Sequence, residues 1–409
     1  MAEITPFRAV RPTRDKAHLV ASRSYVSYSP RHLNRKLQEN PFSFIHIINP
    51  EFGSNVKTKP NSPARFKKVK ARFEQFLADG VLMQDDEPAF YLYRQSSAAS
   101  SSMGLICGVS VAEYAAGKIK IHEQTITSRV SIFTSYLDVC DFNAEPVLLT
   151  YTTEASHLNS LMHALAADRA EYEFSTTDCM KHELWVIDKP GQIAAIQEEM
   201  KAVKTLYIAD GHHRMASSAM LSETRKQRGS QALTDFALAL IVPEQELRIQ
   251  SFHRIIHLEE GLDEKAFLQQ LEKDFSVTKT SLAIYPSKVH QFGMCLSSGW
   301  YTLELIKPIS AKTAIDALDT MVLTRKVLEP LFGIFDQKID RRISFLPENQ
   351  SLSAVEKSIH QGRCTAIFTL HAIGVPELVA VADANEIMPP KSTYIEPKLR
   401  SGLTIMKLS

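Results

Sequence analysis

Cysteine is scarce in this chain, and its distribution excludes two common uses of the residue. The chain has 409 residues and five cysteines, which form no CxxC pair and are odd in number. Scattered cysteines of this kind argue against a zinc site and a disulfide framework, and they favour a reducing, cytoplasmic location. We expect buried structural thiols at all five positions, which are Cys107, Cys140, Cys179, Cys295 and Cys364.

Long apolar runs and an excess of charge are also missing. No apolar run approaches the roughly 20 residues that span a bilayer, and no apolar core follows the charged N-terminal residues. We therefore expect neither a membrane span nor a signal peptide. The formal net charge is only +1, which provides no electrostatic reason to expect nucleic acid or an acidic membrane surface as a partner.

The motifs of several well-known enzyme classes are absent. The sequence has no GxxxxGK(S/T) loop, no GxGxxG after a strand, no HRD and DFG pair and no GxSxG elbow. It has no HExxH either, because Ile126 stands where the second histidine after His122 would be. These absences exclude a zinc protease, and they exclude a P-loop or protein-kinase-type enzyme if the protein handles phosphate.

The most informative segment that is present reads KTLYIADGHHRMASSAM, over residues 204–220. Its apolar run, 206–209, predicts a buried strand, and the small residues over 215–221 predict a helix. The turn and helix start between them consist of Asp210, Gly211, His212, His213 and Arg214. Glycine permits the sharp turn, and a helix N-terminus followed by arginine favours a bound anion. The segment therefore predicts a phosphate site.

A second segment, near the C-terminus, is rich in hydrogen-bond donors. Pro389 and Pro390 stiffen the chain before these donors. The donors are Lys391, Ser392 and Thr393, to which Lys398, Arg400 and Ser401 add more. A rigid loop with cations and hydroxyls suits a phosphate or a carboxylate. We favour this interpretation over an ordinary surface tail, because disordered tails seldom hold so many apolar residues between prolines.

Two weaker candidates lie nearer the N-terminus. Glu123 follows His122, and such a pair can supply a general base or a metal ligand. A surface strand explains this pair equally well. Arg8 and Arg11 are flanked by prolines and suit anion binding, although a surface arginine is the more usual case.

Strand-like and helix-like segments alternate through the centre of the chain, which predicts an α/β domain within a protein that is α+β overall. We expect an N-terminal α+β region over 1–100 and a central catalytic domain over 101–260. A C-terminal α+β region, 261–409, is expected to return its final loop to the active site. Helices are predicted over 63–80 and 314–331 from the spacing of apolar residues.

Several segments, in this order, resemble the DUF1015 family. They are TPFRAVRP, NPFSFIHIINPE, HEQT, ADGHHR and EIMPPKSTYIEPKLRSGL, and they extend over essentially the whole chain. The DGHHR motif is also similar to the phosphate-binding motif of ParB/sulfiredoxin-type domains, a superfamily that includes free serine kinases. The resemblance implies a ParB/sulfiredoxin-like central domain. It further implies a pyrophosphate-dependent kinase of free L-serine, which makes O-phospho-L-serine and phosphate and feeds cysteine biosynthesis.

A mechanism follows as a hypothesis. Mg²⁺ bridges the pyrophosphate oxygens, since phosphoryl transfer depends on positioning and charge neutralisation. The two histidines, Arg214 and the backbone N–H groups after Gly211 hold the phosphates. The Lys391–Thr393 loop and Lys398 close over the phosphates or over the serine carboxylate. Asp210 is assigned to the metal or to orienting the histidines, and Glu123 is the general base.

Two alternatives remain open. The same phosphate cradle would serve an ATP- or ADP-dependent small-molecule kinase, or a ParB-like nucleotide hydrolase. It would also serve a non-enzymatic protein that binds phosphate or phosphoserine and needs no general base. The partners expected are the small molecules L-serine and pyrophosphate, with no nucleic acid and no membrane, and the sequence leaves open whether the protein is a monomer or a homodimer.

Overall fold

The chain forms two compact units in the computed structural model, which describes residues 2–24, 27–152, 156–228 and 233–409. Unit 1 comprises Met1–Lys120, Gln124–Leu247 and Pro397–Ser409, and unit 2 comprises Ile121–Glu123 and Arg248–Glu396. Both units mix helices with sheets, which confirms the predicted mixed α/β class. The ParB/sulfiredoxin likeness of the central region stays a prediction.

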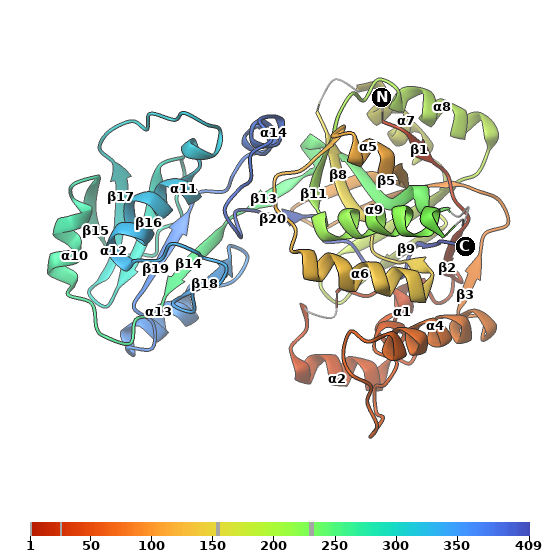
Figure 1. Ribbon diagram of the computed structural model, residues 1–409, viewed down its shortest axis with the longest axis horizontal. Helices are drawn as coiled ribbons and strands as arrows, with labels where there is room; N and C mark the ends of the chain where they lie inside the picture. The colour runs from red at the N-terminus through yellow and green to blue at the C-terminus, as the bar shows by residue number, and fades with distance from the viewer. Residues whose placement is uncertain (1, 25–26, 153–155, 229–232) are drawn as a thin grey trace. The chain divides into compact units, whose positions relative to one another are not determined.

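Unit 1 contains two sheets and the helices that cover them (Figure 1). Its strands are β1 (Ile4–Thr5), β2 (Ala9–Pro12), β3 (Leu82–Gln84), β4 (Phe90–Ser96), β5 (Ser101–Ser110), β6 (Ile119–Lys120), β7 (Phe142–Asn143), β8 (Val147–Tyr151), β9 (Tyr172–Ser175), β10 (Lys181–Ile187), β11 (Leu206–Asp210), β12 (Phe236–Pro243) and β21 (Ile405–Lys407). Its helices are α1 (Ala17–Val20), α2 (Pro30–Glu39), α3 (Ile45–Ile48), α4 (Pro63–Ala78), α5 (Val111–Ala115), α6 (Thr127–Cys140), α7 (Ser156–Leu165), α8 (Pro190–Met200) and α9 (His212–Gln227), with short 3-10 turns η2 (Leu233–Asp235) and η3 (Glu244–Glu246).

The large sheet of unit 1 runs in the order β6-β11-β8-β12-β5-β4-β10-β9, and β1 pairs with β5. The pairs β8–β12 and β6–β11 are parallel, so the sheet is mixed. Its middle is tightly packed: a Cβ added to Gly104 would lie 2.6 Å from the Ile241 carbonyl oxygen. Helices α6 and α9 lie side by side, because the Thr134 hydroxyl of α6 bonds to the Ser217 carbonyl of α9.

The second sheet of unit 1, in the order β3-β2-β21-β7, is covered by α4. This helix confirms the prediction over 63–80, and Ser62 caps its N-terminus by accepting from the Arg65 N–H. Pro63 stands at the first position of the helix, where a backbone N–H has no partner within the helix. The missing N–H of proline therefore costs no hydrogen bond there. Its apolar face is buried against strand residues of the small sheet, which is the expected source of stability for an amphipathic helix.

Unit 2 is built around one six-stranded sheet and a separate two-stranded ladder. Its strands are β13 (Arg248–Gln250), β14 (Phe252–Ile256), β15 (Phe275–Thr280), β16 (Gln291–Leu296), β17 (Gly299–Leu305), β18 (Ile343–Pro347), β19 (Ala366–Leu370) and β20 (Tyr394–Glu396). Its helices are α10 (Glu264–Leu271), η4 (Ile315–Ala317), α11 (Asp319–Leu323), the π turn η5 (Thr324–Leu328), α12 (Glu329–Phe332), α13 (Ser353–His360) and α14 (Val375–Asp383).

The six-stranded sheet, β15-β17-β16-β19-β14-β18, is antiparallel throughout and buried on both faces. Alternate residues of a strand point to opposite faces. Ile256 and Met294 accordingly enter one apolar cluster, whereas Ile255 and Cys295 enter another. This two-sided burial explains why the central strands read as continuous apolar runs.

The single helix predicted over 314–331 is broken in the structure. A 3-10 turn, η4, comes first, and Leu318 is extended before α11 begins. The π turn η5 then precedes Pro330 in α12. Proline cannot donate a backbone hydrogen bond and its ring crowds the preceding turn, so a wider turn here is the physical answer to Pro330.

The three regions predicted from the sequence divide the chain differently from the two compact units. The expected boundary between residues 100 and 101 falls in the hairpin that joins β4 and β5, whose strands are paired over their length. The expected boundary at 260 leaves β14 outside the region that contains the rest of its sheet. Segments near both ends of the chain belong to unit 1, which local sequence patterns do not reveal.

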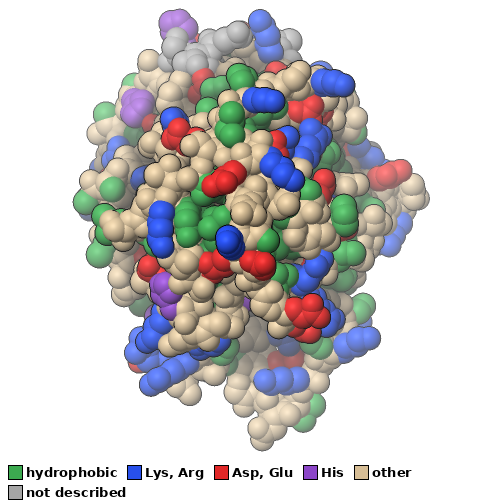
Figure 2. Space-filling model, turned by 90° about the vertical axis from the view of Figure 1, so that its left-hand side faces the viewer, with side chains coloured by type: hydrophobic (Ala, Val, Ile, Leu, Met, Phe, Trp, Pro, Cys, Tyr) green, Lys and Arg blue, Asp and Glu red, His purple; other side chains and the backbone are tan. Residues whose placement is uncertain are grey.

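None of the helices formed by the described residues combines the length and apolar character needed to cross a bilayer. On the face drawn in Figure 2, basic and acidic side chains are interspersed over most of the surface. The expectation that neither nucleic acid nor a membrane is a partner stays a prediction.

Candidate functional site

The DGHHR segment forms the strand, turn and helix that the sequence predicts. Asp210 ends β11, and Gly211 caps α9 in the left-handed region with φ of +99°. No side chain caps this helix N-terminus. A Cβ at position 211 would lie 3.0–3.1 Å from the guanidinium of Arg214, so a glycine is required by conformation and by space.

Arg214 is held in place from two sides. Its Nη1 donates to the carbonyl oxygen of Pro146, which directly precedes β8. Its Nη2 lies 3.6 Å from Oδ2 of Asp210, and the side chain is 25% exposed. The guanidinium is therefore fixed beside the helix N-terminus while part of it still faces solvent.

Asp210 is flanked by a second cation from the end of the chain. Nζ of Lys398 lies 3.2 Å from the same oxygen, Oδ2. Burial disfavours the charged carboxylate, but the positive charges of Arg214 and Lys398 outweigh it and lower the pKa of Asp210 to about 2. Asp210 is thus ionised at neutral pH and is a poor proton acceptor. Lys398 is thus one predicted donor that lies at the motif, whereas the return of the final loop to an active site stays a prediction.

The two histidines of the motif differ in their surroundings. His212 is buried, with 4% of its surface exposed. Nε2 of His213 accepts a hydrogen bond of 3.0 Å from the N–H of Ile126. Burial, followed by the nearby charge of Arg129, lowers the pKa of His213. A neutral His213 that accepts at Nε2 carries its proton on Nδ1, where it can donate.

Glu123 and the Lys391–Thr393 loop lie in unit 2. The N–H of Met388 donates to the carbonyl oxygen of His122, at 2.9 Å, next to the exposed Glu123. The loop Lys391–Thr393 follows Met388 after two prolines. The predicted residues therefore fall into two groups, with Asp210 and its neighbours in unit 1 and Glu123 with the loop in unit 2. The nearness of the two groups stays a prediction.

The loop is organised from beneath by an arginine that the sequence did not single out for this role. Arg254 is fully buried and donates to the carbonyl oxygens of Lys391, at 3.0 Å, and Pro390, at 3.3 Å. Lys391 has a positive φ of 55°, and its Nζ lies 5.2 Å from the ring centroid of Phe252. The hydroxyl of Ser392 is buried and bonds to the Pro389 carbonyl. Ser392 thus holds the loop together.

Arg8 and Arg11, both predicted as anion ligands, are engaged within the fold of unit 1. Nε of Arg8 donates to the carbonyl oxygen of Asp85 at 3.0 Å. Arg11 is 7% exposed and pairs with the carboxylates of Asp85, at 2.7 Å, and Glu171, at 3.1 Å. Buried arginines with paired carboxylates commonly serve the fold, so we do not carry these two residues into the site.

A metal ion at the motif would depend on one carboxylate. Among the described residues, no group of three or more His, Cys, Asp or Glu side chains is arranged to hold a metal. Mg²⁺ is commonly bound by one or two carboxylates together with substrate phosphates and water. The ionised Asp210 fits that pattern, because it supplies a single carboxylate beside an anion site.

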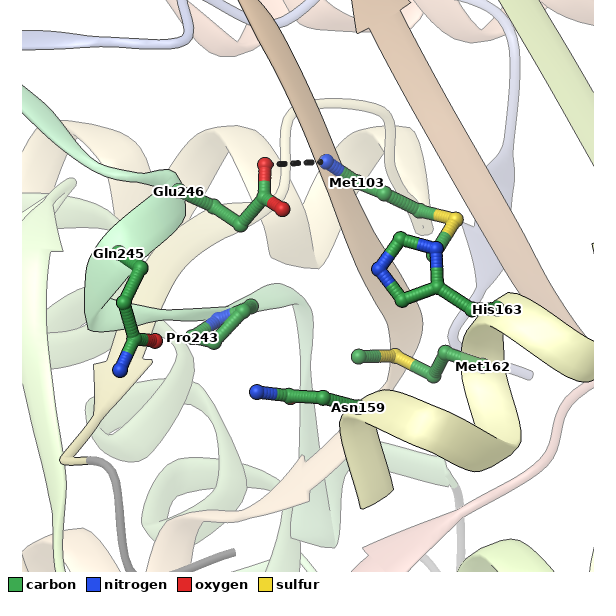
Figure 3. Close-up of a pocket in the computed structure, with 7 residues that line it drawn as sticks. All are labelled: Met103, Asn159, Met162, His163, Pro243, Gln245 and Glu246. Carbon is green, nitrogen blue, oxygen red and sulfur yellow. Dashed lines mark hydrogen bonds between the residues drawn. The ribbon is translucent and has the colours of Figure 1, made fainter. Parts of the chain in front are cut away.

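Two cavities of unit 1 are lined by residues outside the DGHHR motif. One cavity of about 160 Å³ is lined by residues of β5, α7, β12 and η3, and Glu246 accepts a hydrogen bond from the Met103 N–H there (Figure 3). Another, of about 180 Å³, is lined by residues that include Arg14 and Glu171. No predicted site residue lines either cavity.

Three groups at the site escaped sequence analysis. The Pro146 carbonyl and the Ile126 N–H are backbone atoms, which carry no sequence signal of their contacts. The third group, Arg254, is a single arginine, a residue type that is usually exposed, so the sequence gives no signal of its burial. The burial of Arg254 can be expected only once β14 is known to lie between two other strands of its sheet.

Comparison with known proteins provides a family and several remote structural similarities. The profile of a family described as "Protein of unknown function (DUF1015)" matches residues 4–321. A comparison with curated proteins finds no match.

Three solved structures illustrate the remote similarities. A free serine kinase in complex with AMP is 13% identical, with a TM-score of 0.35 over 75% of this chain and 91% of that one. A conserved hypothetical protein from Pyrococcus furiosus is 13% identical, with a TM-score of 0.33 over 74% and 95%. C-terminally truncated SbnI from Staphylococcus aureus is 13% identical, with a TM-score of 0.38 over 74% and 87%. Because these TM-scores are below 0.5, we base no argument on them. The profile match covers most of the chain, and the chain belongs to the DUF1015 family.

Proposed function

We propose that this protein is a phosphotransferase, and specifically a pyrophosphate-dependent kinase of free L-serine. The observation that carries the proposal is the helix N-terminus at Gly211, which has no side-chain cap and is flanked by Arg214 and Lys398. Backbone N–H groups, the helix dipole and two cations together favour a phosphate. The product, O-phospho-L-serine, would feed cysteine biosynthesis in the cytoplasm.

The donor would bind to this surface through charge and hydrogen bonds. Arg214 is already anchored on the Pro146 carbonyl, so it loses little freedom when it binds a phosphate oxygen. Lys398 can turn from Asp210 to the phosphate, because its side chain is 44% exposed. His213 can donate from Nδ1. Pyrophosphate needs such clamps and no pocket for a base, which is why we favour it over ATP or ADP.

Phosphoryl transfer would then proceed in one step. The serine hydroxyl oxygen forms a bond to one phosphorus, and the bridging P–O bond of pyrophosphate breaks to release phosphate. We assign the proton of the serine hydroxyl to the carboxylate of Glu123, because Asp210 is too weak a base. The Lys391–Thr393 loop would hold the carboxylate of serine.

Asp210 is the residue that would hold Mg²⁺, with the phosphate oxygens of the substrate completing its coordination. When bound, the ion would neutralise charge on the pyrophosphate. Asp210 needs no proton transfer for this role, since its carboxylate is ionised across the neutral range.

The test is direct detection of the product. The protein is incubated with Mg²⁺, L-serine and, in turn, pyrophosphate, ATP and ADP, and phosphoserine is measured by mass spectrometry. We expect phosphoserine with pyrophosphate. Product with ATP or ADP alone would make the protein a nucleotide-dependent kinase, and no product with any donor would exclude the kinase.

Two variants tie the activity to the site. Arg214→Gln is expected to lower turnover by about a hundredfold or more, as when one preorganised donor is lost. Lys226→Gln is the matched control, because it removes an exposed cation from the other end of α9 and should change little. If Glu123→Gln retains near-full turnover with an unchanged KM for serine, the base assignment is wrong.

A non-enzymatic phosphate-binding protein is the second candidate. The observation that favours it is the helix N-terminus beside Arg214 and Lys398, which can bind a phosphate without any general base. Phosphate binding without turnover on any donor would support this candidate.

A further inference from the structure

A second group of cations lies in unit 1 and includes none of the residues of the DGHHR motif. Arg400 is 8% exposed, and its Nη2 donates to Oδ2 of Asp178 at 2.6 Å and to Oγ1 of Thr176 at 3.2 Å. The guanidinium of Arg23 pairs with the same Asp178 oxygen. One carboxylate therefore holds two arginines side by side.

A third cation, Lys36, lies close enough to the two arginines for their charges to interact. The pKa of Lys36 is lowered by burial and then by the charge of Arg400, with Arg23 contributing further and Asp178 opposing. The Nζ of Lys36 also lies 5.8 Å from the ring centroid of Tyr28. The three cations thus interact around the single carboxylate of Asp178, which leaves two positive charges in excess.

The buried side chains next to these three cations are polar and uncharged. His182 is fully buried, and its two ring nitrogens lie 2.7 Å from the Tyr93 hydroxyl and 3.2 Å from the Thr176 hydroxyl. Burial and then the charge of Arg400 lower its pKa to about 4, so His182 neither adds nor removes charge at neutral pH. His182 and its hydroxyl partners therefore do not balance the excess of positive charge.

Arg400 also has donors to spare. Its Nε is buried and has no hydrogen-bond partner among the described residues. Only its Nη2 donates to another described side chain. A buried guanidinium with unused donors is costly unless a further acceptor completes its hydrogen bonds. Excess charge and unused donors both call for an anionic acceptor.

We propose that Arg23, Lys36 and Arg400 form a second anion site, which binds a small dianion of the phosphate class. Two excess positive charges match a dianion. Two arginines held on one carboxylate suit the spread oxygens of a phosphate, and Arg23 is 46% exposed, so a ligand can reach the group from solvent. The inference does not depend on the reaction proposed above.

The test is binding of inorganic phosphate to the full chain, measured by equilibrium dialysis with radiolabelled phosphate at low ionic strength. The Arg214→Gln protein serves as the background, because it weakens the motif and leaves the second site intact. We expect this protein to keep one equivalent of bound phosphate. Adding Arg23→Gln and Lys36→Gln together should weaken that binding at least about tenfold, since two charge-assisted contacts are lost.

Arg31→Gln with Lys67→Gln is the matched control, because it removes the same charge from exposed positions of α2 and α4. All variants are checked for an unchanged thermal unfolding midpoint. Equal phosphate affinity in the Arg23/Lys36 pair and in the control pair would overturn the site. Complete loss of binding in Arg214→Gln alone would also overturn it. Serine phosphorylation is a separate readout, so failure here is distinguishable from failure of the kinase proposal.

Discussion

At Gly211 the backbone and the packing make the same demand. The φ of +99° is one that residues with a side chain rarely adopt, and a Cβ there would meet the Arg214 guanidinium at 3.0–3.1 Å. The glycine thus lets the arginine fold back beside the helix N-terminus. A single position joins local conformation to the geometry of the phosphate site.

Substitution of Gly211 separates these two demands. Gly211→Ala should lower the free energy of unfolding by about 1–3 kcal/mol, the usual cost of a side chain in this conformation. It should also displace Arg214 and weaken phosphate binding about tenfold or more, as measured by equilibrium dialysis. Gly117→Ala is the control, because Gly117 has φ of +73° and nothing within 4 Å of an added Cβ. Equal loss of phosphate binding in both variants would contradict the packing argument.

Some residues of these two anion sites can be predicted from the sequence, and others cannot. Asp210 and Lys398 were both predicted as candidates, and their side chains are 3.2 Å apart although 188 positions separate them. The motif is visible because several chemical groups are adjacent in sequence. The pairing of Arg400 with Asp178 is not visible, because the two residues are 222 positions apart and Asp178 alone resembles an ordinary surface charge.

Among the elements, the loop that carries Lys391 depends on a strand that lies beneath it. Arg254 stands in β14, between β19 and the edge strand β18 of the unit 2 sheet, and donates to the carbonyls of Phe252, Pro390 and Lys391. The loop therefore keeps its shape through hydrogen bonds from Arg254 to its backbone carbonyl oxygens. These bonds do not depend on which side chains the loop carries.

Removal of this arginine should loosen the loop. Arg254→Met fills a similar volume but leaves the three carbonyl oxygens without their donor, at a cost of about 1–3 kcal/mol for each buried group that water cannot reach. We expect a lower free energy of unfolding in urea and faster proteolysis between Asp383 and Tyr394. The exposed Arg341→Met should change neither. Unchanged proteolysis in Arg254→Met would show that the prolines alone fix the loop.

Periodicity predicted the elements whose pattern is local. The helix over 63–80 was found because its apolar face repeats every three to four residues, and α4 buries that face. The helix over 314–331 was predicted as continuous because its composition favours helix throughout. Its breaks arise from Pro330 and from an extended Leu318, which a pattern of apolar residues does not register.

At the scale of the whole molecule, the division into units follows strand pairing and not chain order. Unit 2 consists mainly of one stretch, Arg248–Glu396, placed between two parts of unit 1. The three predicted regions followed chain order, because a long-range pair such as β2 with β21 has no local signature. The mixed α/β class was predictable, whereas the insertion was not.

The insertion predicts which fragment folds alone. Residues 248–396 contain the complete six-stranded sheet and its core, so this fragment should unfold cooperatively in urea. Residues 261–409, the region predicted from the sequence, lack β14, which lies between β19 and β18. We expect that fragment to show no cooperative transition. Equally cooperative unfolding of both fragments would contradict the assignment of β14 to the core of unit 2.

The contact between Lys398 and Asp210 has a consequence for the order of biosynthesis. During translation Asp210 leaves the ribosome before Lys398, which follows only after all of residues 248–396 have been made. At the usual elongation rate of about 5–20 residues per second, this delay lasts roughly ten seconds or more. A nascent chain thus presents the DGHHR motif with only one of its two cations. The anion site therefore gains its second cation only after the whole of residues 248–396 has been made.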